Sequence, residues 1–87
     1  MKINAIVINP KDNVAVLTEA VAAEGAIRTE DAEFAAREDI PSHHKVAIAP
    51  IGKGERIVRY GECIGLAAAP IAPGQWVHTH NIRPEDD

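Results

Sequence analysis

The sequence predicts a compact, mainly β domain, and three observations support this prediction. The chain has eleven Ile and seven Val against two Leu, and β-branched aliphatic side chains favour strands over a helical bundle. From Lys45 onward, short apolar runs are repeatedly interrupted by Gly or Pro, a pattern typical of short strands joined by tight turns. The length of 87 residues suits one domain, so we expect a single domain over residues 1–87.

The first quarter of the chain predicts one strand and leaves a second element open. The apolar run at 3–8 predicts a strand, and the Asn and Pro residues of 9–13 predict a turn after it. Residues 14–24 fit a helix that stops at Gly25. They also fit a buried strand over 14–17 that runs into a one-turn helix. We favour the strand.

The next part of the chain is a polar segment, which is followed by a segment with the pattern of β-strands. Residues 28–39 are polar and acidic, and Pro41 closes this stretch because the residue before a proline disfavours the helical conformation. The β pattern then begins at Lys45. We expect short strands around Val46 and Ile48, around Ile57 to Tyr60, around Ile64 and Leu66, at Ile71, and at Trp76 and Val77.

A short pattern occurs twice, twenty residues apart. Residues 49–57 and 69–77 both contain Ala-Pro-Ile, two residues, Gly, two residues and an apolar residue, with a weaker echo at 21–27. Pro supplies a fixed φ and Gly permits a positive φ, so each copy predicts the end of one strand, a turn and the start of the next strand. The fold should therefore contain two similar corners.

The net charge of −4 is unevenly distributed along the chain. Residues 1–42 carry four basic and eight acidic groups, whereas residues 43–83 carry five basic and two acidic groups together with all four His. We expect the second region to attract a small anionic ligand. The overall negative charge and the three aromatic residues argue against a protein that binds nucleic acid.

Cysteine content and hydropathy indicate the cellular compartment of the protein. Cys63 is the single cysteine, which excludes a disulfide framework within the chain, and its apolar neighbours favour an inert thiol. No apolar run has the length of a signal peptide or a membrane span. We therefore expect a cytoplasmic protein that does not contact a membrane.

The segment after Trp76 contains side chains suited to metal or substrate binding. If the strand continues, His78 and His80 share one face at about 7 Å from each other. Two imidazoles at that spacing can supply half of a site for a divalent metal. Asn81 adds an amide that can hold a hydroxyl or a carboxylate. The same pattern also fits two half-exposed histidines on an edge strand, and the spacing leaves both interpretations open.

A second group of candidates lies earlier in the chain. His44 suits proton transfer near neutral pH, and Lys45 suits carboxylate binding or charge stabilisation. Strand alternation would place these two side chains on opposite faces. Arg59, beside Tyr60, could clamp a carboxylate through two hydrogen bonds. An exposed turn and a solubilising arginine are the plain alternatives.

Taken together, these segments resemble a known family. Segments 40–48, 54–65 and 74–81 contain, in order, His-Lys-Val-Ala, Tyr-Gly, Ile-Gly and Trp-Val-His-Thr-His-Asn, and residues 12–17 are similar too. This series resembles the SAF-type domain of the altronate/galactarate dehydratase family. It is also similar to the small subunit of sulfolactate sulfo-lyase. The resemblance covers nearly the whole chain and is weakest at 26–39.

The resemblance implies a β-clip fold with short helical turns and a part in a lyase. The family eliminates water, or sulfite in the sulfo-lyase, from a hydroxy acid with help from a divalent metal, typically iron. Abstraction of the proton next to a carboxylate needs a Lewis acid on the carboxylate and the adjacent hydroxyl, and a protonated group must assist the leaving oxygen. The resemblance further implies that a large subunit or domain carries the main base and most of the metal ligands.

The resemblance also implies roles for particular residues at the junction with that large subunit. They are His44 and Lys45 as catalytic residues, Arg59, Tyr60 and Asn81 as substrate-binding residues, and His78 and His80 as metal ligands shared with the large subunit. One departure from the family pattern is His43, because the residue before the His-Lys pair is usually Gly.

We therefore expect the small subunit or N-terminal domain of an altronate or galactarate dehydratase, inactive alone. The alternatives are a sulfolactate sulfo-lyase small subunit, a non-catalytic module that binds a sugar acid, and a structural cap. The expected partners are a large dehydratase subunit or domain and a small anionic sugar acid, and self-association of the isolated chain stays open. The sequence does not distinguish the substrate, the leaving group, the metal, or whether Asp87 is the natural C-terminus.

Overall fold

Nine short strands and no helix make up residues 2–85, which are the residues that the computed structural model describes. The strands are β1 (Ala5–Ile6), β2 (Val14–Leu17), β3 (Ala26–Arg28), β4 (Glu33–Ala35), β5 (Lys45–Ala47), β6 (Arg56–Arg59), β7 (Glu62–Ala67), β8 (Trp76–Val77) and β9 (Ile82–Arg83). The mainly β fold is confirmed, and so is the strand over 14–17.

The short helical turns that we expected are absent from residues 2–85. Tight turns and bends connect the strands instead, and two isolated β-bridges, Val21–Ile40 and Ile51–Ile71, pair these connections with one another. Residues 1 and 86–87, which belong to the expected domain over 1–87, lie outside the described residues.

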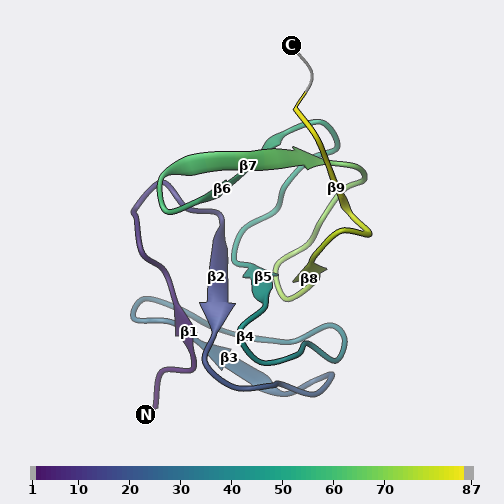
Figure 1. Ribbon diagram of the computed structural model, residues 1–87. Coiled ribbons are helices and arrows are strands. Elements are labelled where there is room, and N and C mark those ends of the chain that lie inside the picture. The colour runs from purple at the N-terminus through teal and green to yellow at the C-terminus, as the bar shows by residue number, and fades with distance from the viewer. Residues whose placement is uncertain (1, 86–87) are drawn as a thin grey trace.

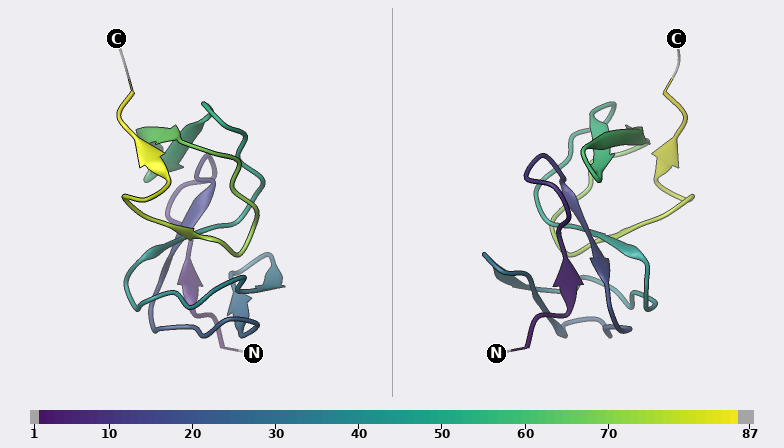
Figure 2. Two further views of the ribbon diagram at one scale, coloured as in Figure 1. Left: turned by 90° about the vertical axis from the view of Figure 1, so that its right-hand side faces the viewer. Right: turned by 60° about the vertical axis from the view of Figure 1, so that its left-hand side comes forward.

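The strands form three small antiparallel sheets, one in the centre of the molecule and one at each end. The central sheet has the strand order β1-β2-β5-β8, a second sheet is the β3–β4 hairpin, and the third has the order β6-β7-β9. Figure 1 shows the central sheet between the β3–β4 hairpin at one end and the β6-β7-β9 sheet at the other. The two views in Figure 2 agree with this arrangement.

The hydrophobic core is divided in the same way. One cluster of buried side chains includes Leu17, Ile27 and Ile40 and packs beneath the β3–β4 hairpin. The other cluster includes Ile57 and Val77 and packs beneath the β6–β7 hairpin. Burial of each such side chain contributes roughly 1.5–3 kcal/mol, so each hairpin is held to the central sheet by its own apolar cluster.

Two backbone pairs join the strand connections at the two ends of the fold. Val21 and Ile40 exchange both of their backbone hydrogen bonds, at 3.0 and 2.8 Å, and Ile51 and Ile71 do the same at 2.9 and 2.8 Å. All four side chains are buried. The repeat predicted at 49–57 and 69–77 is thus a pair of matching corners.

A third corner follows Val21, where the sequence showed a weaker echo of the repeat, and a fourth follows Ile40, where the sequence analysis identified no repeat. Each corner begins with one of the four buried residues of these backbone pairs, and a residue of positive φ follows three positions later. These residues are Glu24 (72°), His43 (68°), Gly54 (84°) and Gly74 (92°). His43 therefore stands at a position that favours Gly for conformational reasons, and its side chain is exposed.

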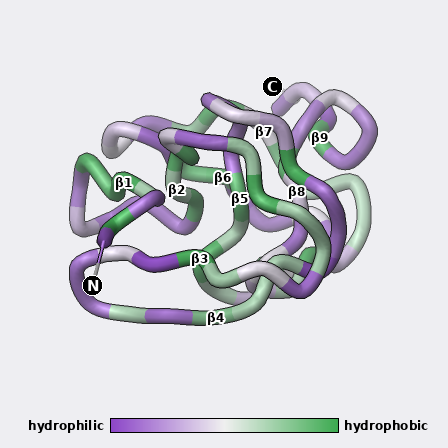
Figure 3. The backbone as a smooth tube through the Cα atoms, turned by 90° about the horizontal axis from the view of Figure 1, so that it is seen from below, coloured by the Kyte–Doolittle hydropathy of each residue, from purple (hydrophilic) through white to green (hydrophobic). Residues whose placement is uncertain are grey.

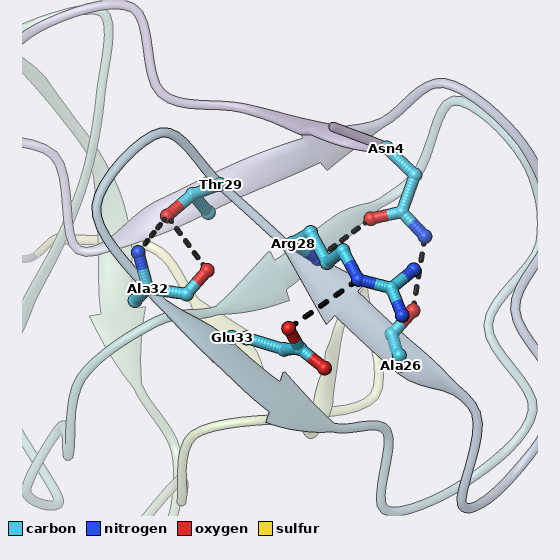
Figure 4. A network of polar contacts seen from close by, with 6 residues as sticks. All are labelled: Asn4, Ala26, Arg28, Thr29, Ala32 and Glu33. Carbon is cyan, nitrogen blue, oxygen red and sulfur yellow. Dashed lines mark hydrogen bonds and ion pairs between the residues drawn. The ribbon is translucent and has the colours of Figure 1, made fainter. Parts of the chain in front are cut away.

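A polar network holds the β3–β4 hairpin to the N-terminal segment (Figure 4). The amide of Asn4 donates to the carbonyl of Ala26 at 2.9 Å, and its oxygen accepts from the backbone N–H of Arg28 at 2.7 Å. Arg28 also pairs with Glu33 across the hairpin at 3.4 Å. The hydroxyl of Thr29 accepts from the backbone N–H groups two and three residues later. Long-range polar contacts thus stabilise a hairpin in a segment that is polar throughout.

A buried carboxylate, Asp12, fastens the turn of the β6–β7 hairpin. Its oxygens accept hydrogen bonds from the backbone N–H of Gly61 at 2.8 Å and of Asn9 at 3.2 Å. Burial by itself would raise the pKa of Asp12, but hydrogen bonds from the backbone of Gly61, Tyr60, Asn9 and Ile8 together bring that pKa below its ordinary value. The charged carboxylate is therefore the form that stabilises the turn.

An apolar edge runs along the N-terminal strand. The side chains of Ile3, Ile6, Val7 and Ile8 are all exposed, and Ile8 keeps 57% of its surface accessible. Figure 3 shows this hydrophobic stretch beside β1 at the outer edge of the molecule. Since β1 and β8 are the two outer strands of the central sheet, this apolar edge and β8 lie at opposite sides of that sheet.

Candidate functional site

The pairing of β5 with β8 brings together two of the segments identified in the sequence. Lys45 lies opposite Val77 and Val46 lies opposite Trp76 in this antiparallel pair. One step further in this register, His44 comes opposite His78. Their ring centroids are 4.8 Å apart. Residues separated by more than thirty positions in the chain thus become direct neighbours.

Four rings form a cluster at the end of β8, which we call the imidazole cluster: His44, Trp76, His78 and His80. The indole of Trp76 contacts all three imidazoles. It stacks nearly parallel on His78, with centroids 5.3 Å apart and planes at 10°. It meets His44 edge-on at 5.5 Å and His80 at 5.2 Å. The indole N–H also donates to Nδ1 of His44 at 3.1 Å.

The chain does not continue as a strand through His78 and His80, so that expectation was wrong. Strand β8 ends at Val77, and the next residues form a turn. Asn81 closes this turn, because its side-chain oxygen accepts from the backbone N–H of His78 at 2.9 Å and its backbone N–H donates to the carbonyl of His78 at 3.0 Å. The turn still leaves both imidazoles against Trp76.

The amide of Asn81 is engaged on both sides. Its NH₂ group donates to the carbonyl of Trp76 at 2.8 Å, in addition to the bond that its oxygen accepts, and the residue is only 9% exposed. These contacts fix the path of the chain from Trp76 to Asn81. Contact between Asn81 and the substrate stays a prediction.

Lys45 brings a positive charge to the same region. Partial burial lowers the pKa of Lys45, and the nearby charge of Arg59 lowers it further. The pKa of His78 is also lowered, by desolvation first and then by the positive charges of His44, Lys45 and His80. The pKa values of Lys45 and His78 are thus both lowered by neighbouring positive charges in addition to desolvation.

Arg59 is the last residue of strand β6, and Tyr60 follows it in the turn. The guanidinium of Arg59 lies over the ring of Tyr60, with Cζ 4.8 Å from the ring centroid. The Nε atom of Arg59 is buried and has no hydrogen-bond partner. Tyr60 is half-exposed and has a φ of 58°. Neither Lys45 nor Arg59 belongs to an ion pair within residues 2–85, so their charges are available to an external anion.

The structure brings some of the predicted site residues into contact and leaves the others at the level of electrostatic proximity. His44, His78 and His80 share the imidazole cluster, Lys45 and Arg59 are in electrostatic contact, and Asn81 anchors the turn. The sequence analysis gave no role to Trp76, although it quoted this residue within a motif. The available signal was the alternation that places Trp76 and His78 two residues apart.

The arrangement does not form a complete metal site within residues 2–85, where no three metal-ligating side chains come together suitably. Nδ1 of His44 is occupied by the indole N–H, which leaves His78 and His80 as at most two imidazole ligands. Two ligands are fewer than the three or four protein ligands of a typical zinc site. The residues present therefore fit a shared metal site only, and the metal-binding role stays a prediction.

Other parts of the fold bear little on this site. One hollow of the surface lies along the apolar edge beside β1, lined among others by Ile6, Ile8 and Thr29. The imidazole cluster lies instead on an open surface, where His80 is exposed and His44 and His78 are half-buried. Within residues 2–85 there is no helix of the length and hydropathy needed to cross a membrane.

Comparisons with known proteins place the chain in a family. The family model described as the altronate/galactarate dehydratase SAF domain matches residues 3–85. The chain is 38% identical over 78 residues to altronate dehydratase of Escherichia coli (strain K12), which covers 90% of the chain and 16% of that protein. It is 36% identical over 72 residues to galactarate dehydratase (L-threo-forming) of the same organism, with coverages of 83% and 14%.

A third relative has a different size. The chain is 38% identical over 53 residues to (2R)-sulfolactate sulfo-lyase subunit alpha of Paracoccus pantotrophus, covering 61% of the chain and 79% of that subunit. The chain thus spans less than a fifth of either dehydratase but most of this subunit. The relatives therefore carry this domain either within a much longer chain or as one subunit of a lyase. The match over residues 3–85 shows that the chain belongs to the altronate/galactarate dehydratase SAF domain family.

Proposed function

We propose that this chain is the small subunit or N-terminal domain of a metal-dependent lyase that eliminates water from a sugar acid of the altronate or galactarate type. In this proposal the chain supplies one wall of the substrate pocket and a large catalytic subunit or domain supplies the other. The isolated chain is inactive.

One observation carries the proposal: the imidazoles of His44 and His78 meet, and the charge of Lys45 lies within electrostatic range of both His78 and Arg59. The positive charges of Lys45 and Arg59 have no carboxylate partner within residues 2–85, and Nε of Arg59 is buried without an acceptor. An anionic substrate would supply the missing counter-charge for both residues.

The roles of the cations follow from this chemistry. Arg59 binds the substrate carboxylate, since a guanidinium presents paired donors to a carboxylate. Tyr60 forms the exposed flank of this site next to Arg59. Lys45 lies within electrostatic range of both Arg59 and His78. Its ammonium group assists the departure of the hydroxyl oxygen by donating a proton or a hydrogen bond.

The imidazoles have different roles, and His44 is the one that acts on a hydroxyl group of the substrate. His44 hydrogen-bonds the leaving oxygen together with Lys45, and His80, which is exposed, reaches toward the companion. Asn81 holds the turn that presents His78 and His80. In the reaction, a base on the companion takes the proton next to the carboxylate, the carbon–oxygen bond breaks, and the hydroxyl leaves as water with a proton from this chain.

The metal belongs mainly to the companion. A divalent cation, expected to be iron, would supply a Lewis acid for the carboxylate and the adjacent hydroxyl of the substrate. His78 and His80 are the residues of this chain that would complete its ligand set. This division agrees with the absence of a complete ligand set within residues 2–85.

A second candidate keeps the site and changes the leaving group. The domain covers 79% of a sulfolactate sulfo-lyase subunit, which favours a separate small subunit that works with a larger one. In that case the same cations would bind sulfolactate, and sulfite would leave in place of water.

The test is reconstitution with the large dehydratase-like polypeptide that accompanies this chain in its source. Turnover is measured for the chain alone, the large polypeptide alone and the mixture, with altronate, galactarate and sulfolactate as substrates. We expect keto-acid formation from altronate or galactarate in the mixture only. Release of sulfite from sulfolactate would select the second candidate. Full activity of the large polypeptide alone would overturn both candidates, and measurable binding of a sugar acid to the isolated chain would favour the non-catalytic module.

A further inference from the structure

We infer that Trp76 is a positioning residue that holds His44 as the neutral tautomer with its proton on Nε2, so that His44 is a hydrogen-bond donor to the substrate and not the base. The inference rests on the proposed function for its catalytic meaning. The tautomer itself follows from the contacts of the two rings.

The direction of the hydrogen bond determines the tautomer. The indole nitrogen of Trp76 lies 3.1 Å from Nδ1 of His44. An indole N–H is a donor and never an acceptor, so Nδ1 must offer its lone pair and cannot carry a proton. A neutral imidazole then has its proton on Nε2. Protonation of Nδ1 would set two N–H donors against each other.

Both rings are held in place by independent contacts. The backbone of His44 is fixed to β2, because its carbonyl accepts from the N–H of Leu17 at 2.9 Å. The backbone N–H of Trp76 donates to the carboxylate of Glu38 at 3.1 Å, and its carbonyl accepts from Asn81. His78 stacks on the indole face. The indole N–H is therefore aimed at His44 before any ligand binds.

The chemical consequence concerns what His44 can do. The single hydrogen bond that its imidazole ring makes within residues 2–85 is through Nδ1, which leaves the Nε2 proton for a ligand. A base needs a free lone pair, and in this tautomer neither ring nitrogen offers one. His44 therefore stabilises negative charge that develops on a substrate oxygen, and proton abstraction belongs to another group.

The tautomer is measured directly by long-range proton–nitrogen NMR correlations of the ¹⁵N-labelled chain at a pH where the imidazoles are neutral. We expect His44 to show an unprotonated Nδ1 and a protonated Nε2, in an excess of roughly fivefold or more, the effect of one hydrogen bond of ordinary strength. A protonated Nδ1 in the unmodified chain would overturn the inference, and this measurement needs no variant.

Trp76→Phe supplies the matched variant, since it keeps an aromatic ring beside the imidazoles and removes the N–H. We expect the tautomer excess of His44 to fall several-fold while the exposed His43 is unaffected. An unchanged excess in a folded variant would contradict the role of the indole. In the reconstituted enzyme, the same variant should lower kcat more than it changes KM. The NMR result does not depend on turnover, so failure of the inference and failure of the proposed function are distinguishable.

Discussion

Gly54 and Gly74 occupy the same position in two corners of the same shape, but only Gly74 lies against another part of the backbone. Their φ values are 84° and 92°. A Cβ at position 54 would meet nothing within 4 Å, whereas a Cβ at position 74 would collide with the carbonyl oxygen of Ala35. The two glycines therefore separate the cost of the backbone conformation from the cost of a steric clash.

Replacement of each glycine by alanine should show this difference. We expect Gly54→Ala to lower the free energy of unfolding by about 1 kcal/mol, the ordinary cost of a positive φ for a residue with a Cβ. Gly74→Ala should cost at least about 2 kcal/mol more, because the β3–β4 hairpin must move away from the corner. Urea unfolding of both variants gives the comparison. Equal losses in the free energy of unfolding would show that the carbonyl of Ala35 does not lie against Gly74 as described.

His43 occupies the equivalent corner position with a φ of 68°, so His43→Gly should stabilise the fold. Relief of the left-handed conformation gains about 1–2 kcal/mol, and the extra freedom of glycine in the unfolded chain offsets about 0.5–1 kcal/mol of this. We expect a net gain of about 0.5–1 kcal/mol and a rise in Tm of several degrees. His43→Ala, which keeps the Cβ, is the control and should bring no gain. A stabilisation by alanine equal to that by glycine would rule out backbone strain as the cause.

The hydrogen bonds of Asp12 make the stability of the fold depend on pH. Its pKa in the folded chain lies below the ordinary 3.8, so the folded state binds fewer protons than the unfolded state near that pH. The stabilisation is fully present above pH 3.8 and is lost as the pH falls through the folded pKa. We expect Asp12→Asn to cost about 1–2 kcal/mol at pH 7 and markedly less below pH 3.8.

Urea unfolding at both pH values measures this convergence. Glu19→Gln, at an exposed position, serves as the control and should change the free energy of unfolding by no more than about 0.5 kcal/mol. If the effect of Asp12→Asn were the same at both pH values, the charge of Asp12 would have no part in fastening the turn.

Lys45 should titrate below the ordinary lysine value of 10.5. Burial remains when Arg59 is changed, but its positive charge is lost, so Arg59→Gln should raise the pKa of Lys45 part of the way back. The proton and carbon shifts of the Lys45 Cε group, followed by NMR against pH, report this directly. Arg56→Gln is the matched control, because Arg56 lies at the other end of β6 and pairs with Glu85. Equal effects of the two variants on the pKa of Lys45 would show that Arg59 does not act on Lys45 more than a distant arginine does.

Local sequence patterns predicted some elements well. The strand over 14–17 and the two corners at 49–57 and 69–77 depend on neighbouring residues, namely a buried apolar run and Pro and Gly at turn positions. The β3–β4 hairpin was not predicted, because it depends on hydrogen bonds from Asn4, more than twenty residues away. Such a long-range contact leaves no periodic signal in the polar segment itself.

The candidate site shows the same division. His44, Lys45, His78 and His80 were identified from their residue types and the family resemblance, and the structure brings the three imidazoles together around Trp76. The role of Trp76 could not be predicted, because the contact with His44 depends on the register between β5 and β8. The turn after Val77 was also missed, although an Asn three residues after His78 is suited to closing such a turn.

The central claim is that the surface formed by Lys45, Arg59 and the imidazole cluster is one wall of a working active site. The most direct test is kcat/KM for keto-acid formation by the reconstituted enzyme with Lys45→Ala, compared with Lys53→Ala at an exposed position in a corner. We predict a loss of about 100-fold or more for Lys45→Ala and a change within about twofold for Lys53→Ala. Activity within a few-fold of the unmodified enzyme for both variants would contradict the claim and leave the domain a structural cap.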